Sequence, residues 1–197
     1  WNNSKYFIIK KSAIDEHQLE CLNTDGYEAF DDNKTNKKQP VLIMPRGIGA
    51  RHYCSYNNCN GYSASGVEVY IPEKEANKDD VIRLWYFLNS TLCWLIREIS
   101  GRKNLGGGML KAEAIDLKKF GIYLNFEVNE EIRNTFESFS GLYADNANVE
   151  IEKEVHKKID MVVFEYLGLD FEQQKYIEAE LISKVNSRYK KASTKIK

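Results

Sequence analysis

The stretch that decides the fold class is DDVIRLWYFLNSTLCWLIREISG, residues 79–101. Its apolar residues recur at steps of three and four, which is typical of a helix with one face turned to a hydrophobic core. They are Val81, Leu84, Trp85, Leu88, Leu92, Leu95, Ile96 and Ile99. Asn77 or Asp79 can cap the start, and Gly101 stands where many helices end in a left-handed residue. The pattern therefore predicts one long helix over residues 79–100.

Three short strands are predicted before this helix. Residues 5–10, 41–44 and 67–71 read KYFIIK, VLIM and VEVYI, and these aromatic and β-branched runs favour strands. Pro45 and Pro72 follow the second and third runs, and proline commonly ends a strand because it cannot donate a backbone hydrogen bond.

Minor elements complete this first part of the chain. Polar residues fill positions 23–39, which we interpret as an exposed loop. After the long helix we expect a helical stretch over 113–119 and a strand over 121–124. The sequence thus predicts an α+β fold class, with a mixed strand and helix domain over residues 1–125.

The remainder of the chain is helical by its pattern. Three successive stretches each place apolar residues on one face. These residues are Ile132, Phe136, Phe139 and Tyr143 in the first, Ile151, Val155, Ile159, Val162, Val163 and Tyr166 in the second, and Phe171, Ile177, Leu181 and Val185 in the third. We predict a small C-terminal helical bundle over residues 126–197 that packs on the first domain.

The composition is that of a globular protein. The 197 residues are 43% hydrophobic and 29% charged, with room for one domain or one domain with a helical appendage. No apolar run reaches the ~18 residues of a membrane span, and no secretion signal opens the chain. The first residue is Trp1 rather than Met, so we expect a piece of a longer protein.

Cysteine usage points to free thiols. Four cysteines in a chain without a secretion signal indicate a reducing compartment. Cys54 and Cys59 lie near His52, but their C-x4-C spacing has no second ligand pair behind it, whereas structural zinc sites usually have two. We interpret these cysteines as buried or half-buried thiols and predict no metal site.

Charge is strongly segregated along the chain although the net charge is only −1. Residues 125–180 hold fourteen acids and five bases, a local net charge of −9. Residues 181–197 hold six bases and no acid, and residues 101–120 hold five bases and two acids. Because the distribution of charge steers a charged ligand, the neutral total excludes no polyanion partner.

The basic stretch RKNLGGGMLK, residues 102–111, invites a phosphate interpretation. It matches neither a P-loop, which needs Gly-Lys-Ser/Thr before a helix, nor a dinucleotide fingerprint, which follows a strand. Glycines still let a backbone approach a bulky ligand, and the flanking bases suit a sugar-phosphate backbone. The alternative is a solvated turn between helix and strand.

A second candidate surface is PRGIGARHY, residues 45–53, with the polar run YNNCNGY at 56–62. Arginine is the commonest bidentate reader of guanine, and asparagine reads adenine. The alternative for the polar run is a hairpin turn, since Asn-Gly is a strong hairpin signal. Catalytic motifs are not found, and His156, within an acidic helix, is predicted to be solvated surface. We assign no catalytic residue.

From about residue 40 onward the chain resembles the C-terminal target-recognition (specificity) domain of adenine-specific DNA methyltransferases of restriction-modification systems. Five segments carry the resemblance: LNSTLCWL (88–95), GRKNLGGGMLK (101–111), DLKKFGI (116–122), EVHKKIDMVVFEYLGL (154–169) and VNSRYKK (185–191). The catalytic loop of the family, Asn/Asp/Ser-Pro-Pro-Tyr/Phe, has no counterpart because the three prolines are not adjacent.

The resemblance implies a sequence-specific double-stranded DNA-recognition module that lacks the catalytic domain and is itself no enzyme. Its partners would be double-stranded DNA and the catalytic domain of the parent chain, which would bind the cofactor S-adenosylmethionine, in the cytoplasm of a prokaryote and associated with the nucleoid. No cofactor is expected on this chain. The expected DNA-binding residues are Arg46, Arg51, Tyr53, Asn57, Asn58, Arg102, Lys103, Asn104 and Lys111. The alternative is a protein-interaction module that binds a partner subunit without contacting DNA.

Overall fold

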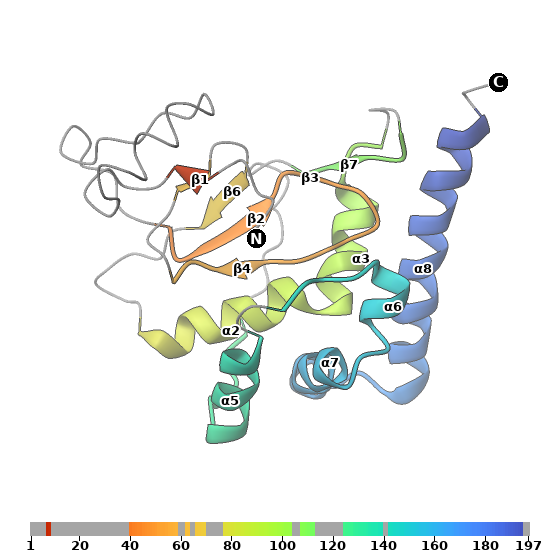
Figure 1. Cartoon of the computed structure of the whole chain (residues 1–197). Coiled ribbons are helices and arrows are strands. Elements are labelled where there is room, and N and C mark those ends of the chain that lie inside the picture. Colours follow the sequence, from red (N-terminus) through yellow and green to blue (C-terminus); the bar gives the residue numbers. More distant parts are fainter. Residues whose placement is uncertain are drawn as a thin grey trace.

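The computed structural model describes residues 7–8, 40–58, 62–63, 66–69, 77–103, 107–112, 124–139 and 142–194. This part of the chain is mixed, with helices packed beside small antiparallel sheets (Figure 1). The helices are α2 (Lys78–Asn89), α3 (Thr91–Ser100), α5 (Glu130–Ser138), α6 (Ala147–Glu150), α7 (Glu154–Tyr166) and α8 (Phe171–Thr194). The strands are β1 (Phe7–Ile8), β2 (Leu42–Pro45), β3 (Gly47–Ile48), β4 (Ser55–Tyr56), β5 (Tyr62–Ser63), β6 (Gly66–Val69) and β7 (Leu110–Lys111).

The strands form three small antiparallel sheets. The largest has the order β4-β2-β6, with Leu42 opposite Tyr56 on one side and opposite Val69 on the other. The pairs β1-β5 and β3-β7 make the other two. The strands predicted within residues 5–10, 41–44 and 67–71 correspond to β1, β2 and β6. The helix predicted over 113–119 lies outside the described residues, as do residues 121–123 of the strand predicted over 121–124.

The prediction of a single helix over residues 79–100 is wrong, because the helix is interrupted at Ser90. Ser90 has an extended backbone, ends α2 and begins α3 as its N-cap, where its side chain accepts a hydrogen bond from the Cys93 amide (3.2 Å). A serine hydroxyl competes with the helical hydrogen-bond pattern in this way and favours helix starts. The apolar period continues through the break, so periodicity alone could not show it.

The polar residue before the break fastens α2 to the strands. The buried Asn89 side chain accepts from the Cys54 amide (2.8 Å) and donates to the Cys54 carbonyl (2.9 Å). The side-chain amide of Asn89 thereby satisfies both backbone polar groups of the buried Cys54, as a neighbouring strand would. The β3–β4 connection is held on α2 by these two bonds.

The α2–α3 break is also tied to α7. The Thr91 amide donates to Asp160 Oδ1 (2.8 Å), the Thr91 hydroxyl donates to Asp160 Oδ2 (2.5 Å), and His156 Nε2 lies 2.9 Å from the same hydroxyl oxygen. His156 is only 1% exposed, so its prediction as solvated surface is wrong. Its ring packs on Trp94 (4.6 Å between centroids) and is satisfied by Thr91, a buried partner 65 residues away.

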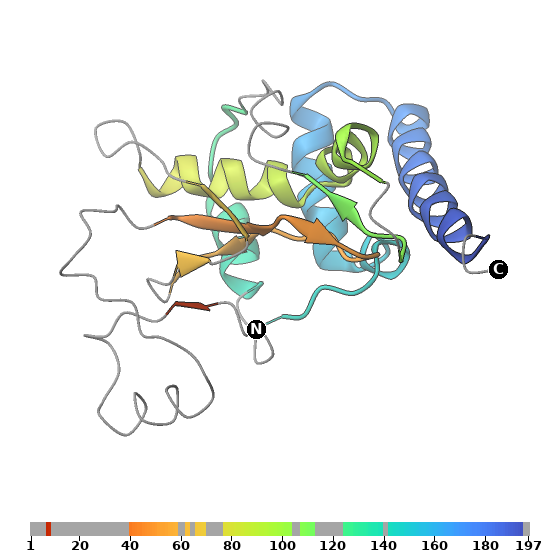
Figure 2. The same ribbon diagram turned by 90° about the horizontal axis from the view of Figure 1, so that it is seen from above.

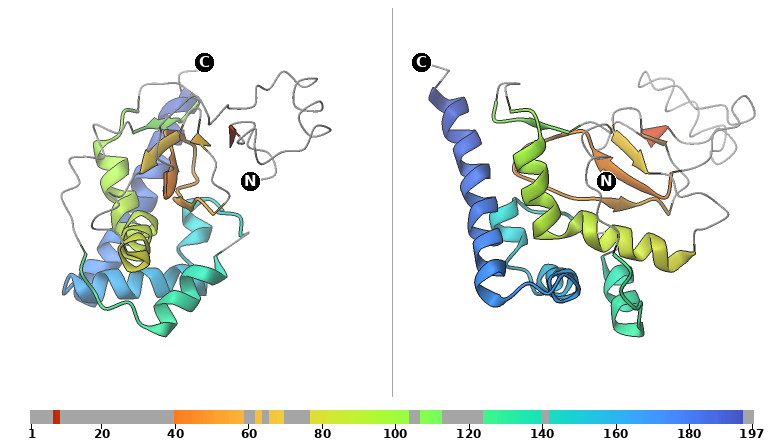
Figure 3. Two further views of the ribbon diagram at one scale, coloured as in Figure 1. Left: turned by 90° about the vertical axis from the view of Figure 1, so that its left-hand side faces the viewer. Right: turned by 180° about the vertical axis from the view of Figure 1, so that it is seen from behind.

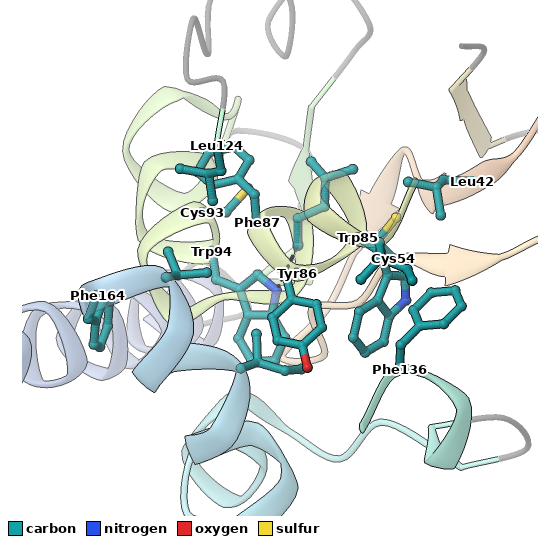
Figure 4. Packing of buried hydrophobic residues seen from close by; sticks show 14 of the residues in the cluster. Leu42, Cys54, Trp85, Tyr86, Phe87, Cys93, Trp94, Leu124, Phe136 and Phe164 are labelled. Carbon is teal, nitrogen blue, oxygen red and sulfur yellow. Dashed lines mark hydrogen bonds between the residues drawn. The ribbon is translucent and has the colours of Figure 1, made fainter. Parts of the chain in front are cut away.

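A continuous hydrophobic cluster joins strands and helices. Trp85 makes edge-to-face contacts with Tyr86 and Phe136, and Cys54 and Leu42 lie on the strand side (Figure 4). The cluster continues through α7 to Val185 on α8.

Two ion pairs, Arg133–Asp79 and Lys78–Glu137, bind α5 to the start of α2. The division into domains at residue 125 stays a prediction, and the core runs across it.

The arrangement separates the two kinds of charge. In Figure 1 and in the rear view of Figure 3, β7 and the C-terminal end of α8 lie at one end of the molecule, and α5 and α7 lie at the other. Figure 2 shows α8 alongside α3. The acidic helices α5 and α7 are therefore remote from the basic end of α8.

None of the described helices combines the length and the apolar character that crossing a bilayer requires.

Replacing Asn89 by Ala should lower the free energy of unfolding, by roughly 1–3 kcal/mol for each buried polar group that loses its partner. The Cys54 amide and carbonyl are the two groups concerned. Chemical denaturation measures the change. Asn134→Ala, at an exposed position on α5, is the control and should change stability by no more than about 0.5 kcal/mol. Equal stability of the two variants would contradict the role given to Asn89.

Candidate nucleic-acid interface

Strand β7 follows the glycine-containing loop in the sequence and pairs with β3. Gly47 lies opposite Lys111, and Ile48 lies opposite Leu110. On its other side Lys111 pairs with Arg102, whose amide donates to the Lys111 carbonyl at 2.9 Å. Directly opposed residues project to the same face of a ladder. Arg102 and Lys111 therefore share one face, beside a glycine that adds no side chain.

The C-terminal half of α8 lies against this ladder. A Cβ atom added to Gly108 would come within 2.9 Å of the Tyr189 ring, and one on Gly49 within 2.9 Å of the Tyr189 hydroxyl. Gly108 also has a φ of +71°, which favours glycine. Two glycines from different loops thus make room for one tyrosine of α8. We call β3, β7, residues 102–103 and residues 184–191 of α8 the basic edge.

A buried ion cluster lies beneath the basic edge. Arg188 on α8 donates to both carboxylate oxygens of Glu98 on α3, at 3.2 Å from Nε and 2.6 Å from a terminal nitrogen. It also donates to the carbonyls of Gly49 (2.9 Å) and Gly108. Glu98 is fully buried and Arg188 is 4% exposed. By sequence Arg188 counts among the bases of the tail, but in the structure it lies inside the fold.

His52 completes this cluster. Its Nε2 lies 3.0 Å from Glu98 Oε1, and its ring stacks on Trp94 at 5.5 Å between centroids. Because the Glu98 carboxylate accepts, Nε2 carries the proton, and Nδ1 has no hydrogen-bond partner among the described residues. A proton on Nδ1 would be buried without an acceptor, which favours the neutral ring. Burial lowers the pKa of His52 below its ordinary 6.5 and outweighs the hydrogen bond to Glu98.

The hydrogen bonds in the cluster keep Glu98 ionised. Burial alone would raise the pKa of this carboxyl, but the hydrogen bonds from His52 and Arg188 outweigh burial and lower the pKa. A second buried arginine, Arg97, donates to the carbonyl of Pro45, next to the predicted DNA-binding residue Arg46. Two buried arginines thus hold backbone carbonyls under the exposed residues of the 45–49 and 107–111 segments.

Two basic segments of the sequence meet at the basic edge. Partial burial lowers the pKa of Lys103, and the positive charges of Lys184, Arg188 and Lys191 lower it further, against the opposing effect of Glu98. Lys184, Arg188 and Lys191 come from residues 181–197, and Lys103 comes from residues 101–120, so both base-rich stretches meet in one region. Within it Lys184 is paired with Glu180 (2.7 Å) and Arg188 with Glu98 (2.6 Å). Positive charges this close repel one another and favour binding of a polyanion.

Most of the predicted DNA-binding residues are accessible. Arg46, Arg51, Tyr53, Asn58, Arg102 and Lys103 are exposed, and Lys111 is half-buried. Arg46 lies at the junction of β2 and β3, where its carbonyl accepts from the Ala112 amide (2.9 Å). Arg46, Arg102, Lys103 and Lys111 therefore belong to, or adjoin, the basic edge.

Two of the predicted residues, Asn57 and Arg51, have protein neighbours of their own. Asn57 is 8% exposed, and its side chain donates to the carbonyl of Pro40 (2.7 Å), so we remove it from the expected base-reading residues. Arg51 lies near Asp145: the pKa of this carboxyl is lowered first by Lys153 and also by Arg51. Asn104 lies outside the described residues.

The contribution of α8 to this surface is not predicted from the sequence. The base-rich end of the helix is visible as composition, but its apolar period predicts only packing. Tyr189, Lys190 and Lys191 are exposed, and Arg188 reaches loops 80 and 139 residues away in sequence. The signal that could have indicated this contribution is the group of three bases within four positions, Arg188, Lys190 and Lys191.

The described residues include no group of three or more histidine, cysteine or acidic side chains placed to hold a metal ion. Cys54 and Cys93 are free and buried. Burial raises the pKa of the Cys93 thiol to about 12 and that of Cys54 further. At neutral pH these two thiols are protonated core residues.

Comparisons of the chain with protein-family models, with curated protein sequences and with solved structures found no match.

The neutral state of His52 predicts a pH dependence of stability. Because burial lowers its pKa in the folded state, the unfolded chain takes up a proton first as the pH falls below 6.5. The free energy of unfolding should therefore decrease with acidification from about pH 7 to 5, by at most ~1.4 kcal/mol per pH unit. In His52→Gln this contribution should vanish. Subtracting the pH series of the variant from that of the wild type removes the contributions of the other titratable groups. Parallel pH curves would contradict a neutral buried His52.

Proposed function

We propose that this chain is a sequence-specific double-stranded DNA-recognition module and that DNA lies along the basic edge. The convergence of the two base-rich segments carries the proposal. Arg102, Lys103 and Lys111 come from one segment and Lys191 comes from α8, where Lys184 is already paired with Glu180, while the acidic helices lie at the other end of the molecule. Local charge of this kind attracts a polyanion even when the net charge is −1.

The residues divide into two roles in this proposal. Lysines and arginines of the basic edge contact phosphates, which position a protein on a duplex without reading sequence. Arg46, Tyr53 and Asn58 are exposed on the neighbouring segment and have the side-chain types that contact base edges. Arg51 also remains a candidate for reading a base. Its positive charge is partly neutralised by its negative neighbour Asp145.

The parent protein proposed from the resemblance is an adenine-specific DNA methyltransferase of a restriction-modification system, acting in a prokaryotic cytoplasm. In that protein S-adenosylmethionine and the flipped adenine would belong to a separate catalytic domain. The chain contains no adjacent prolines, so it cannot supply the family's catalytic loop. We therefore propose that this chain reads DNA and does not transfer the methyl group.

The salt dependence of duplex binding tests this function. If the basic edge contacts phosphates, the logarithm of the association constant should fall linearly with the logarithm of salt concentration, by about 0.9 per phosphate contact. Fluorescence anisotropy with a labelled duplex measures it from low to physiological salt. Absence of binding at low salt, or binding that does not depend on salt, would reject the proposal.

Single substitutions should separate the two roles. Lys103→Ala and Lys111→Ala should weaken binding to all duplexes alike and reduce the salt slope by about 0.9 each. Arg46→Ala should cost about 1–3 kcal/mol on the preferred sequence and little on random DNA. Lys175→Ala is the matched control, since this exposed lysine packs over Phe171 near the start of α8. Equal losses on preferred and random duplexes would remove Arg46 from the base-reading residues.

One observation favours the second candidate, a protein-interaction module. A pocket of about 450 Å³ lies between α2, α5 and α7, with Tyr86 and Phe126 in its lining and Met161 and Tyr166 exposed beside them. Three glutamates, Glu127, Glu131 and Glu165, and one lysine, Lys158, also line it. An acidic pocket with aromatic walls suits a basic side chain of a protein partner. This surface is distant from the basic edge, so a charge reversal at Glu131 should leave DNA binding unchanged if DNA lies where we propose.

A further inference from the structure

We propose that Arg188 is a positioning residue for the basic edge: it does not touch DNA, but fixes the 45–49 and 107–111 segments so that their exposed bases match a duplex. The inference rests on the proposed function and adds the residue on which the geometry of that site depends.

Arg188 makes several hydrogen bonds in different directions. Its three nitrogens donate to the Glu98 carboxylate and to the carbonyls of Gly49 and Gly108. The two carbonyls belong to separate loops, and Glu98 belongs to α3. Only a planar guanidinium has enough donors in a fixed arrangement to serve all three at once. Arg188 therefore joins a helix and two loops at one point.

The next residue, Tyr189, acts on the same two loops. It lies over Gly49 and Gly108: a Cβ atom on Gly108 would come within 2.9 Å of its ring, and one on Gly49 within 2.9 Å of its hydroxyl. The guanidinium of Arg188 is 5.3 Å from the centre of this ring. Bonds from Arg188 and contact with Tyr189 thus act on the same two glycines. The position of α8 sets how far apart the two loops lie.

The Arg188 guanidinium is not accessible to a phosphate. Its side chain is 1% exposed and the Glu98 side chain is 0% exposed, so a phosphate cannot reach the guanidinium without opening the fold. Residues that do reach solvent are carried by the segments it holds. Met109 and Lys111 follow Gly108, and Arg46 precedes the loop that contains Gly49. Arg188 can influence DNA only through these neighbours.

Arg188→Lys tests the inference. A lysine keeps the positive charge next to Glu98 but cannot also hold both glycine carbonyls. Duplex affinity should fall by about tenfold while the salt slope stays that of the wild type, because no phosphate contact is removed. In the same variant, hydrogen–deuterium exchange should increase in residues 46–52 and 107–112 and stay unchanged in α7. Circular dichroism and the unchanged exchange of α7 show that the chain is folded.

A second variant reaches the same contact without altering Arg188. Gly108→Ala places a methyl group against the Tyr189 ring and should lower affinity with an unchanged slope. Gly168→Ala is its matched control: Gly168 also has a positive φ (+66°), but a Cβ atom added there would meet no atom within 4 Å. The affinity of this control should equal that of the wild type after correction for stability.

Each outcome decides between the roles. A salt slope reduced by about 0.9 with unchanged exchange would mean that Arg188 itself contacts a phosphate and would overturn the inference. Unchanged affinity and unchanged exchange in Arg188→Lys would reduce it to ordinary packing and also overturn it. If the wild type binds no duplex, the proposed function fails, and the exchange comparison alone decides whether Arg188 positions the loops.

Discussion

The Glu98–Arg188 pair is the interaction on which the end of the molecule that carries the basic edge depends. Removing two charges from water costs several kcal/mol for each ion, and only close geometry with further hydrogen bonds offsets it. Here His52 and two glycine carbonyls supply those bonds. Such a pair adds little net stability, but it tolerates only one arrangement of the segments around it. Its contribution is therefore to the geometry of the basic edge.

Helix α3 is held at both ends by buried polar clusters of this kind. At its start Thr91 is bonded to Asp160 of α7, and at its end Glu98 is bonded to Arg188 of α8. Trp94 lies between them, packed on His156 on one side and on His52 on the other. A ten-residue helix fixed at both ends cannot slide along its neighbours. This explains why α7 and α8 keep a defined position relative to the strands.

The sequence predicted the apolar elements and missed the buried polar ones, for a physical reason. Hydrophobic period reports which face of a helix is buried, so β2, α2 and α7 could be placed from it. It does not report what lies opposite. His156 is buried against Thr91, 65 residues away, and the segment after the Ser90 break is tied through Thr91 to Asp160, 69 residues away. Likewise Arg46 and Lys103 could be predicted as exposed bases, whereas Arg188, also a base, is buried by Glu98, 90 residues away.

One cause of the bases around the end of α8 lies in the helix itself. A helix carries partial negative charge at its C-terminus, so lysine and arginine stabilise its last turns regardless of any ligand. That cause does not apply to Lys103, which lies beside α8, and whose pKa is lowered by partial burial and by three positive neighbours on that helix. At the other end of the molecule, bases likewise face acids, as in Lys78–Glu137 and Arg133–Asp79. Among the positive neighbours of Lys103, Lys184 pairs with Glu180 and Arg188 with Glu98, so the positive charge beside α8 is partly compensated within the protein. Lys103 and Lys191 remain exposed there, and in the proposed function the phosphates of a duplex would offset their mutual repulsion.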